Sequence, residues 1–290
     1  MVTLTLTQAL VNGLALGAQY AVLALGFSLV FGVLNVINFA HGGFYMLGGY
    51  FTFSAMSAAG LPYVVALLVG ALGVAVVGAV MELVLIEPIV DNHEATLTVS
   101  LGFFLVLTAG VTALYGPDPV PVEFPVSSVL RFGGLYIPVA RLIVIAVSVA
   151  AVAALWFLLY RTKYGLALRA LSENREVATM QGLRPRTFFP LAVALSAGLA
   201  ALAGGLVTPI FTLEPVVAQT ALMTSFVVVV LGGLGSLVGA AGAAVAFGIA
   251  EAVGGAYLSG SLTQLLLFAA VLALLLVRPT GLAGRRLRDA

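Results

Sequence analysis

The sequence predicts an all-α, polytopic membrane helix bundle with about eight or nine transmembrane helices. Of its 290 residues, 62% are hydrophobic and only 8% are charged, whereas a soluble domain has roughly 45–50% apolar and about 25% charged residues. One span needs roughly 20 apolar residues, so this composition has room for about nine. The apolar runs are long and continuous, unlike the short alternating strands of a membrane β-barrel. A soluble globule, a disordered chain and a nucleic-acid-binding protein are excluded.

Nine apolar runs follow one another along the chain, and each is expected to be helical because backbone groups in hydrocarbon must bond internally. The seventh run is short and lies between prolines and glycines, so at least one segment is expected to be broken or re-entrant. The first run has no Lys or Arg before it and is expected to be a retained span rather than a signal peptide. The runs are Gln8–Leu34, Ala40–Ala59, Pro62–Ile86, Thr96–Tyr115, Pro138–Tyr160, Pro190–Val207, Ala218–Leu231, Leu237–Leu258 and Leu262–Val277.

The positions of Lys and Arg predict the orientation of the chain. Ten of the twelve basic residues lie in the loop 161–187 and the tail 278–290, so both segments are expected in the cytoplasm. Two segments on the same side of the membrane must be separated by an even number of spans, and the four runs between these two meet that condition. Counting back places the proline-rich segment Gly116–Leu135 and the N-terminus outside, and Glu87–Ala95 inside although it has no basic residue. We expect one permease domain, 1–290, with a cytoplasmic coupling loop at 161–187.

Residues for catalysis and for metal binding are scarce. The chain has no cysteine and two histidines, which leaves no thiolate site. A Walker motif needs Gly-Lys-[Ser/Thr], and the single lysine, Lys163, stands between Thr162 and Tyr164. The stretch His93–Leu97 lacks the second histidine of a zinc motif. We therefore expect no enzyme, no metal and no bound cofactor in this chain.

A polar cluster lies where the first apolar run ends and the second begins. Two amides, an imidazole and paired glycines at a helix break can line a substrate pathway, because a discontinuous helix directs its terminal dipole at a polar ligand. A plain helix–helix turn, in which Asn38 caps the next helix, is an equal alternative. The candidate pathway residues are Asn35, Asn38, His41, Gly42 and Gly43.

A second cluster lies between the seventh and eighth runs. Its small residues let backbones approach closely, and Gly235 and Gly239 form a G-x-x-x-G face. An unwound pathway-lining segment and a packing motif are equally compatible with this composition. The candidate pathway residues here are Gly232, Gly233, Gly235 and Ser236.

Two carboxylates fall inside apolar runs. An acidic group in mid-bilayer costs on the order of 2.5–3.5 kcal/mol, so such a residue normally faces a cavity or a partner. Glu251, well inside the eighth run, is the pathway candidate. Glu82 lies near the inner end of the third run, and we expect it to be a solvated end residue.

The loop 161–187 contains a stretch typical of a short amphipathic helix, Leu166–Met180. Such a helix can dock into a groove of a soluble partner or lie flat on the lipid surface. Its charged residues include Arg169, Glu173 and Glu176, and the stretch Glu176–Gly182 resembles the E-A-A-x-x-x-G loop of ABC importer permeases, with Val177 in place of the first alanine.

These blocks together resemble the LivH-type branched-chain amino-acid ABC transporter permease family. The blocks occur in family order over nearly the whole chain. They are Asn38-Phe39-Ala40-His41-Gly42, Arg169-Ala170 leading to Ala178 and Gly182, Gly232-Gly233-Leu234-Gly235-Ser236 through Gly239-Ala240, and Arg278-Pro279-Thr280-Gly281-Leu282-Ala283-Gly284.

The resemblance implies one membrane subunit of an importer in a prokaryotic cell membrane. Its partners would be a second homologous permease, two cytoplasmic ATPase subunits that hydrolyse ATP, and an external solute-binding protein. Asn38, His41 and Gly42 would belong to the pathway break, and Arg169, Ala178 and Gly182 to the ATPase-facing loop. Glu87 stands where family members usually have a basic residue.

Three functions stay open from the sequence. We expect an ABC permease for branched-chain or related amino acids. Close relatives of that family carry urea or short amides, and no motif here separates these substrates. A secondary transporter driven by an ion gradient would need ionisable residues along its pathway, for which Glu82, Glu251 and His41 are a small supply.

Overall fold

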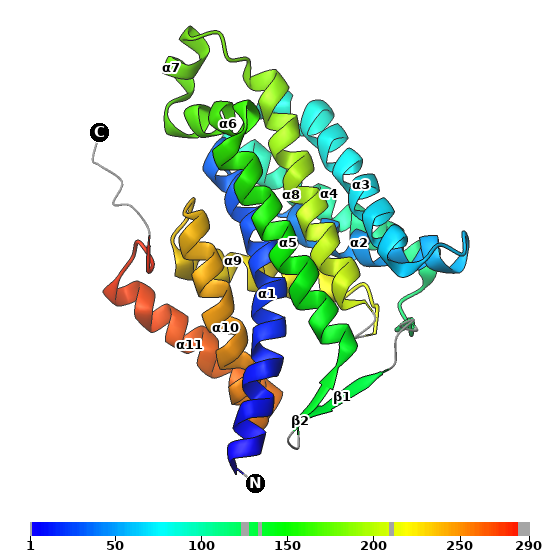
Figure 1. Ribbon diagram of the computed structural model, residues 1–290. Helices are drawn as coiled ribbons and strands as arrows, with labels where there is room; N and C mark the ends of the chain where they lie inside the picture. Colours follow the sequence, from blue (N-terminus) through cyan, green and yellow to red (C-terminus); the bar gives the residue numbers. More distant parts are fainter. Residues whose placement is uncertain (1, 123–127, 133–134, 209–211, 284–290) are drawn as a thin grey trace.

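Nine apolar helices form the bulk of the computed structural model, which describes residues 2–122, 128–132, 135–208 and 212–283 (Figure 1). Each helix covers one of the nine predicted apolar runs, which confirms the all-α membrane bundle. They are α1 (Val2–Leu34), α2 (Ala40–Ser57), α3 (Tyr63–Met81), α4 (His93–Tyr115), α5 (Val139–Arg161), α8 (Pro185–Val207), α9 (Val217–Gly232), α10 (Leu237–Tyr257) and α11 (Gly260–Val277). A π-helical turn, Glu82–Ile86, and a 3₁₀ turn, Glu87–Ile89, extend α3.

Seven of these described helices are long and apolar enough to cross a membrane, and α2 and α9 are the other two. At 1.5 Å per residue, the 16 residues of α9 reach only about 24 Å, which is shorter than a hydrocarbon core of about 30 Å. Helix α2 is largely buried against α8, α3, α9 and α4. The chain is therefore a multi-pass membrane protein in which α9 is too short for a full span.

Two kinds of structure mark the opposite ends of the bundle (Figure 1). Helices α6 (Lys163–Glu173) and α7 (Arg175–Met180) cover one end. The N-terminus and a two-stranded antiparallel sheet, β1 (Val129–Phe132) and β2 (Leu135–Pro138), lie at the other. We call these the coupling end and the hairpin end.

The sequence places the proline-rich segment Gly116–Leu135 outside the membrane but does not predict the hairpin that begins within it. The side-chain amide of Gln8 holds it to α1. Gln8 Nε2 donates to the Tyr136 carbonyl oxygen over 2.9 Å, and Tyr136 N–H donates to Gln8 Oε1 over 3.0 Å. Gln8 thus pairs with the outer edge of β2 as a strand would.

The single helix expected over Leu166–Met180 is wrong, because the chain breaks at Asn174. That residue has an extended backbone, with φ −158° and ψ 104°, and its Oδ1 accepts a hydrogen bond from Val177 N–H over 3.0 Å. An asparagine in this geometry is a helix N-cap. It ends α6 and starts α7 in a new direction.

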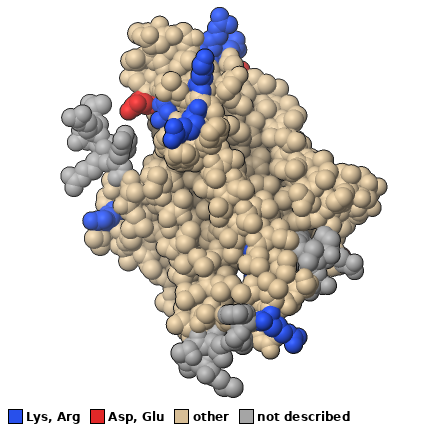
Figure 2. All heavy atoms as spheres, in the orientation of Figure 1, with Lys and Arg blue, Asp and Glu red and all other residues tan. Residues whose placement is uncertain are grey.

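Charge is distributed unevenly between the two ends. Lys and Arg side chains gather over the end with α6 and α7 (Figure 2). The acidic segment between α3 and α4 lies at the same end, because Asp91 and Glu87 form ion pairs with Arg175 and Arg186. This places 87–92 beside the basic loop, as the parity of the spans predicted.

The centre of the bundle depends on glycines at helix crossings. A Cβ added to Gly48 of α2 would overlap the backbone of Ala201 in α8, and one added to Gly204 of α8 would overlap the backbone of Tyr45 in α2. Helix α10 runs antiparallel to α1 through a similar contact between Gly17 and Gly248. Small residues at such crossings let helices pack closely where no hydrophobic effect drives them together.

Gly48→Ala is therefore expected to destabilise the protein by about 1–3 kcal/mol, because the new methyl group forces α2 and α8 apart. The matched control is Gly102→Ala in α4, where an added Cβ meets nothing within 4 Å among the described atoms. There the change should be neutral or slightly stabilising. Thermal unfolding of the two variants in detergent measures the difference, and equal melting temperatures would contradict it.

Candidate functional site

His41 joins three helices in the middle of the bundle. It lies in the first turn of α2 and is 2% exposed. One ring nitrogen, Nε2, lies 3.0 Å from the Leu23 carbonyl oxygen of α1, and the other, Nδ1, lies 3.3 Å from Ser196 Oγ of α8. The Phe27 ring packs edge-on against the His41 ring, with 5.4 Å between the two ring centroids. Both nitrogens have partners, so the arrangement favours a structural role for His41 at the α1–α2 break.

The break itself is held by asparagines. Asn35 adopts a positive φ of 56° directly after α1, a conformation that asparagine tolerates better than most residues. Asn38 Oδ1 accepts from Ala40 N–H, the first amide of α2, over 2.9 Å, while Phe39 is the N-cap residue of that helix. Ser100 of α4 accepts from Phe39 N–H over 3.2 Å. The geometry favours the helix–helix turn, although Asn38 bonds to the start of α2 from the position before the N-cap. A pathway role for Asn38 stays a prediction.

Gly42 and Gly43 contact neighbouring helices rather than an open channel. A Cβ added to Gly42 would overlap the carbonyl group of Ala218 at the start of α9, and one on Gly43 would lie 2.9 Å from Leu107 of α4. Both glycines are therefore helix-packing residues in this structure: Gly42 packs against α9 and Gly43 against α4.

The glycines between α9 and α10 form a tight turn. Gly233 and Gly235 have positive φ values of 102° and 77°, and Ser236 Oγ accepts from Gly239 N–H at the start of α10. Gly232 packs against Gly239 with no space for a side chain. A Cβ on Gly32, near the end of α1, would lie 3.8 Å from the Gly235 Cα.

The C-terminal motif completes this turn. Leu282 N–H and Ala283 N–H donate to the carbonyl oxygens of Leu231 and Gly232, over 2.8 and 3.0 Å. These are the last carbonyls of α9, which have no partner within the helix. The described part of the tail thus seals the end of a short helix, and Gly284 lies outside the described residues.

Glu251 has a partner within the protein. Tyr20 of α1 donates from its hydroxyl to Glu251 Oε2 over 2.9 Å, and the Tyr20 ring packs against Phe247 at 6.1 Å. The pair lies where α1 packs against α10. It belongs neither to the α1–α2 break nor to the turn between α9 and α10. Glu251 is therefore a helix–helix bonding residue in this conformation, and its pathway role is untested.

Glu82 departs most from expectation. We expected a solvated end residue, but Glu82 is 0% exposed. Neither carboxyl oxygen has a hydrogen-bond partner among the described residues. It begins the π-helical turn and lines a small pocket with Asn38 and Thr96. An acidic residue within an apolar run is a sequence signal for burial. In this case the position of Glu82 near the end of the run favoured a solvated residue instead.

The structure therefore brings together only part of the predicted pathway. Asn38 and Glu82 line the same pocket. Asn38 is also close in sequence to His41 and Gly42. The Gly232–Ser236 turn lies at the far end of α9 from Gly42, about 24 Å away by helix length. The lining of the Glu82 pocket includes no residue of the Gly232–Ser236 turn. π-helical turns occur often at functional sites, which favours the Glu82 pocket over the others.

The coupling loop contains the short helix α7, which has a defined C-terminal cap. Gly182 has φ +85°, and Gly182 N–H and Leu183 N–H donate to the carbonyls of Thr179 and Ala178. This is a Schellman motif, in which glycine is favoured. Ala178 is buried while Val177 and Met180 are 53% and 83% exposed. Glu173 and Glu176 are also exposed.

Arg169 is used within the protein. Its guanidinium lies 4.8 Å from the centre of the Tyr160 ring, so it holds α6 against α5 through a cation–π contact. It is half-buried and therefore offers less surface to a partner than the sequence suggested.

Two ion pairs connect the coupling loop to the end of α3. Arg175 Nη1 lies 2.6 Å from Asp91 Oδ1, and Arg186 pairs with Glu87. Glu87, the acid found where the family usually has a base, thus meets a basic residue at the start of α8. The Arg175–Asp91 pair is solvent-exposed, and such a pair adds only about 0–1 kcal/mol of stability, so its main effect is to fix the positions of the two segments.

Comparison with known proteins gives a consistent family. The model for "Branched-chain amino acid transport system / permease component" matches residues 9–276. The permease protein LivH of Escherichia coli (strain K12), named for high-affinity branched-chain amino acid transport, is 32% identical over 96% of this chain and 95% of its own. BraD of Pseudomonas aeruginosa is 28% identical over the same shares, and a probable LivH of Methanocaldococcus jannaschii is 29% identical over 90% and 87%. No solved structure matches significantly.

Glu82→Met is expected to raise the free energy of unfolding by about 1–3 kcal/mol, the usual cost of a buried polar group without a partner. Glu251→Met is the matched control, because that carboxylate accepts a hydrogen bond from Tyr20 and its loss should destabilise the protein. Thermal unfolding of both variants tests the contrast. A loss of stability in Glu82→Met would mean that the carboxyl group has a stabilising partner.

Proposed function

Since this chain belongs to the family of branched-chain amino acid transport system permease components, we propose that it imports branched-chain amino acids with energy from separate ATPase subunits. The single observation that carries this proposal is α7, which exposes Val177 and Met180 at the basic end of a membrane bundle. The sequence holds no Walker motif, so ATP would be hydrolysed by the partners and no cofactor is expected on this chain.

The proposed assembly contains a second homologous permease, two cytoplasmic ATPase subunits and an external solute-binding protein. It would lie in a prokaryotic cell membrane with the coupling end in the cytoplasm. The gathering of Lys and Arg at that end (Figure 2) supports this orientation. The hairpin end would then face the solute-binding protein.

Helix α7 is the proposed contact with the ATPase. It stands at the tip of the bundle (Figure 1), and its two exposed apolar side chains flank the buried Ala178. Short helices of this kind dock apolar side chains into a groove of a partner. Gly182 would end the helix abruptly and keep the following chain clear of the contact.

A movement of α7 has a path into the bundle. The Arg186–Glu87 pair joins the start of α8 to the 3₁₀ turn 87–89, and the Arg175–Asp91 pair joins α7 to the segment directly after that turn. That turn continues into the π-helical turn that carries Glu82, opposite Asn38 at the α1–α2 break. Docking and release of the ATPase would thus shift the equilibrium between outward-open and inward-open states.

The decisive experiment is reconstitution of the full complex in proteoliposomes with its solute-binding protein. ATP-dependent uptake of labelled leucine supports the proposal, whereas uptake of urea or short amides alone would replace the substrate class. The isolated chain is tested under a proton or sodium gradient without ATP. Uphill uptake there would establish the secondary-transporter alternative.

Val177→Ser with Met180→Ser is expected to lower ATP-dependent uptake at least ten-fold, because the contact with the ATPase loses its apolar side chains. Co-purification of the ATPase subunits measures the same loss directly. Leu130→Ser is the matched control for co-purification of the ATPase subunits, since Leu130 is also about half exposed but lies on the hairpin, at the opposite end of the bundle. Unchanged co-purification in the double variant would rule out α7 as the docking helix.

Reversal of one charge, Asp91→Arg or Arg175→Asp, is expected to lower the number of amino acids carried per ATP hydrolysed, with little effect on stability. The two changes combined should restore that ratio, because the pair is re-formed with opposite signs. Arg184→Glu serves as a control, since Arg184 is exposed and forms no ion pair within the described chain. Additive defects in the double variant would show that the pair does not transmit movement.

A further inference from the structure

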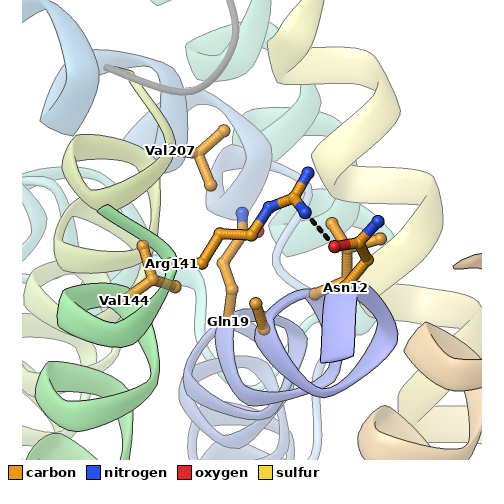
Figure 3. A pocket seen from close by; sticks show the side chains of 7 residues that line it. Asn12, Gln19, Arg141, Val144 and Val207 are labelled. Carbon is orange, nitrogen blue, oxygen red and sulfur yellow. Dashed lines mark hydrogen bonds between the residues drawn. The ribbon is translucent and has the colours of Figure 1, made fainter. Parts of the chain in front are cut away.

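A pocket at the hairpin end contains an arginine that none of the proposed steps uses. It lies between the outer parts of three helices and holds about 60 Å³. Its lining is Asn12, Ala15, Leu16 and Gln19 of α1, Arg141 and Val144 of α5, and Val207 of α8 (Figure 3). The pocket therefore combines a charged and amide-containing side with an apolar side.

Arg141 reaches across this pocket. Its guanidinium extends from the first turn of α5 to α1 (Figure 3), where Nη1 donates to Asn12 Oδ1. Gln8 Nε2 also donates to Asn12 Oδ1, over 3.1 Å. An arginine that served lipid headgroups would extend away from the helices toward the membrane surface, whereas this one lies between them.

The guanidinium lacks a counter-charge. Of its five N–H donors, one is used by the neutral Asn12, and no carboxylate of residues 2–122, 128–132, 135–208 or 212–283 forms an ion pair with it. Arginine recognises carboxylates through two parallel hydrogen bonds. An arginine inside a membrane bundle without an acidic partner is thus suited to an anion that arrives from outside.

The rest of the pocket matches an apolar amino acid. Leu16, Val144 and Val207 supply aliphatic walls beside the guanidinium. Gln19, which is buried and donates to Tyr45 Oη over 2.9 Å, continues the polar face of α1 toward the centre of the bundle. A volume of about 60 Å³ admits several water-sized groups, which is enough for a carboxylate but too little for a whole leucine.

We propose that Arg141 and Asn12 form an outer subsite that binds the carboxylate group of the transported amino acid after its release at the hairpin end. This inference rests on the proposed function, because it takes the substrate to be a zwitterion that enters there. The aliphatic part of the substrate would extend past Leu16, Val144 and Val207 and out of the pocket, which is too small to enclose it. Arg141 would thus select solutes with a free carboxylate over amides and urea.

Asn12→Asp is the sharpest test. It preserves the size of the side chain and gives Arg141 a permanent carboxylate within the protein, which competes with that of the substrate. We expect leucine uptake by the reconstituted complex to fall at least ten-fold while thermal stability is kept or raised. Arg141→Gln should lower uptake to a similar extent, and Arg141→Lys less. Arg278→Gln, an exposed arginine directly after α11, should transport like the wild type.

The outcomes separate this subsite from the proposed function. If the wild-type complex transports leucine and both Asn12→Asp and Arg141→Gln do so equally well, the subsite is wrong and the importer stands. If the wild-type complex carries no branched-chain amino acid, the function itself fails. Each variant is also assayed in vesicles with and without phosphatidylglycerol. A defect of Arg141→Gln that appears only with the anionic lipid would assign the guanidinium to a lipid phosphate and overturn the proposal.

Discussion

Inside hydrocarbon, each backbone N–H and C=O group must find its partner within the protein, and this constraint decides what the two helix breaks look like. At the α1–α2 break, Asn38 and Ser100 accept from the N–H groups of Ala40 and Phe39. At the end of α9, the C-terminal segment donates to the carbonyls of Leu231 and Gly232. Polar side chains and the chain's own tail thus replace the helical bonds that the breaks remove.

The π-helical turn at Glu82 is a further irregularity of the bundle, and it is a place where movement can enter. Helices kink at π-helical turns, and such turns occur often at functional sites. The turn at Glu82 lies between the ion-paired coupling end and the pocket beside Asn38. Close glycine contacts such as Gly48 with Ala201 keep α2 and α8 together meanwhile. Within the described residues, the bundle therefore combines closely packed helix crossings with a π-helical connection to the coupling end.

Charged groups within the bundle fall into two classes. Glu251 accepts a hydrogen bond from Tyr20, and the Arg169 guanidinium lies over the Tyr160 ring, although Arg169 Nε has no hydrogen-bond partner among the described residues. Glu82 and Arg141 do not have a counter-charge among the residues described, and they lie toward opposite ends of the bundle. A substrate with one carboxylate and one ammonium group is complementary to such a pair of sites, although it would meet them one after the other.

The sequence by itself determined the nine apolar helices, the shared end of the loop 161–187 and the segment 87–95, and the family, because hydrophobic length, basic residues and short glycine motifs are local properties of the chain. It did not determine the hairpin, which depends on Gln8 meeting Tyr136 across 128 positions, or the division of the coupling helix at Asn174. Only the tertiary structure decided that His41 is enclosed by three helices, that Glu82 is buried and that Arg141 meets Asn12. These facts depend on which helix faces which, and helix packing in a membrane is set by side-chain shape at each crossing rather than by apolar periodicity.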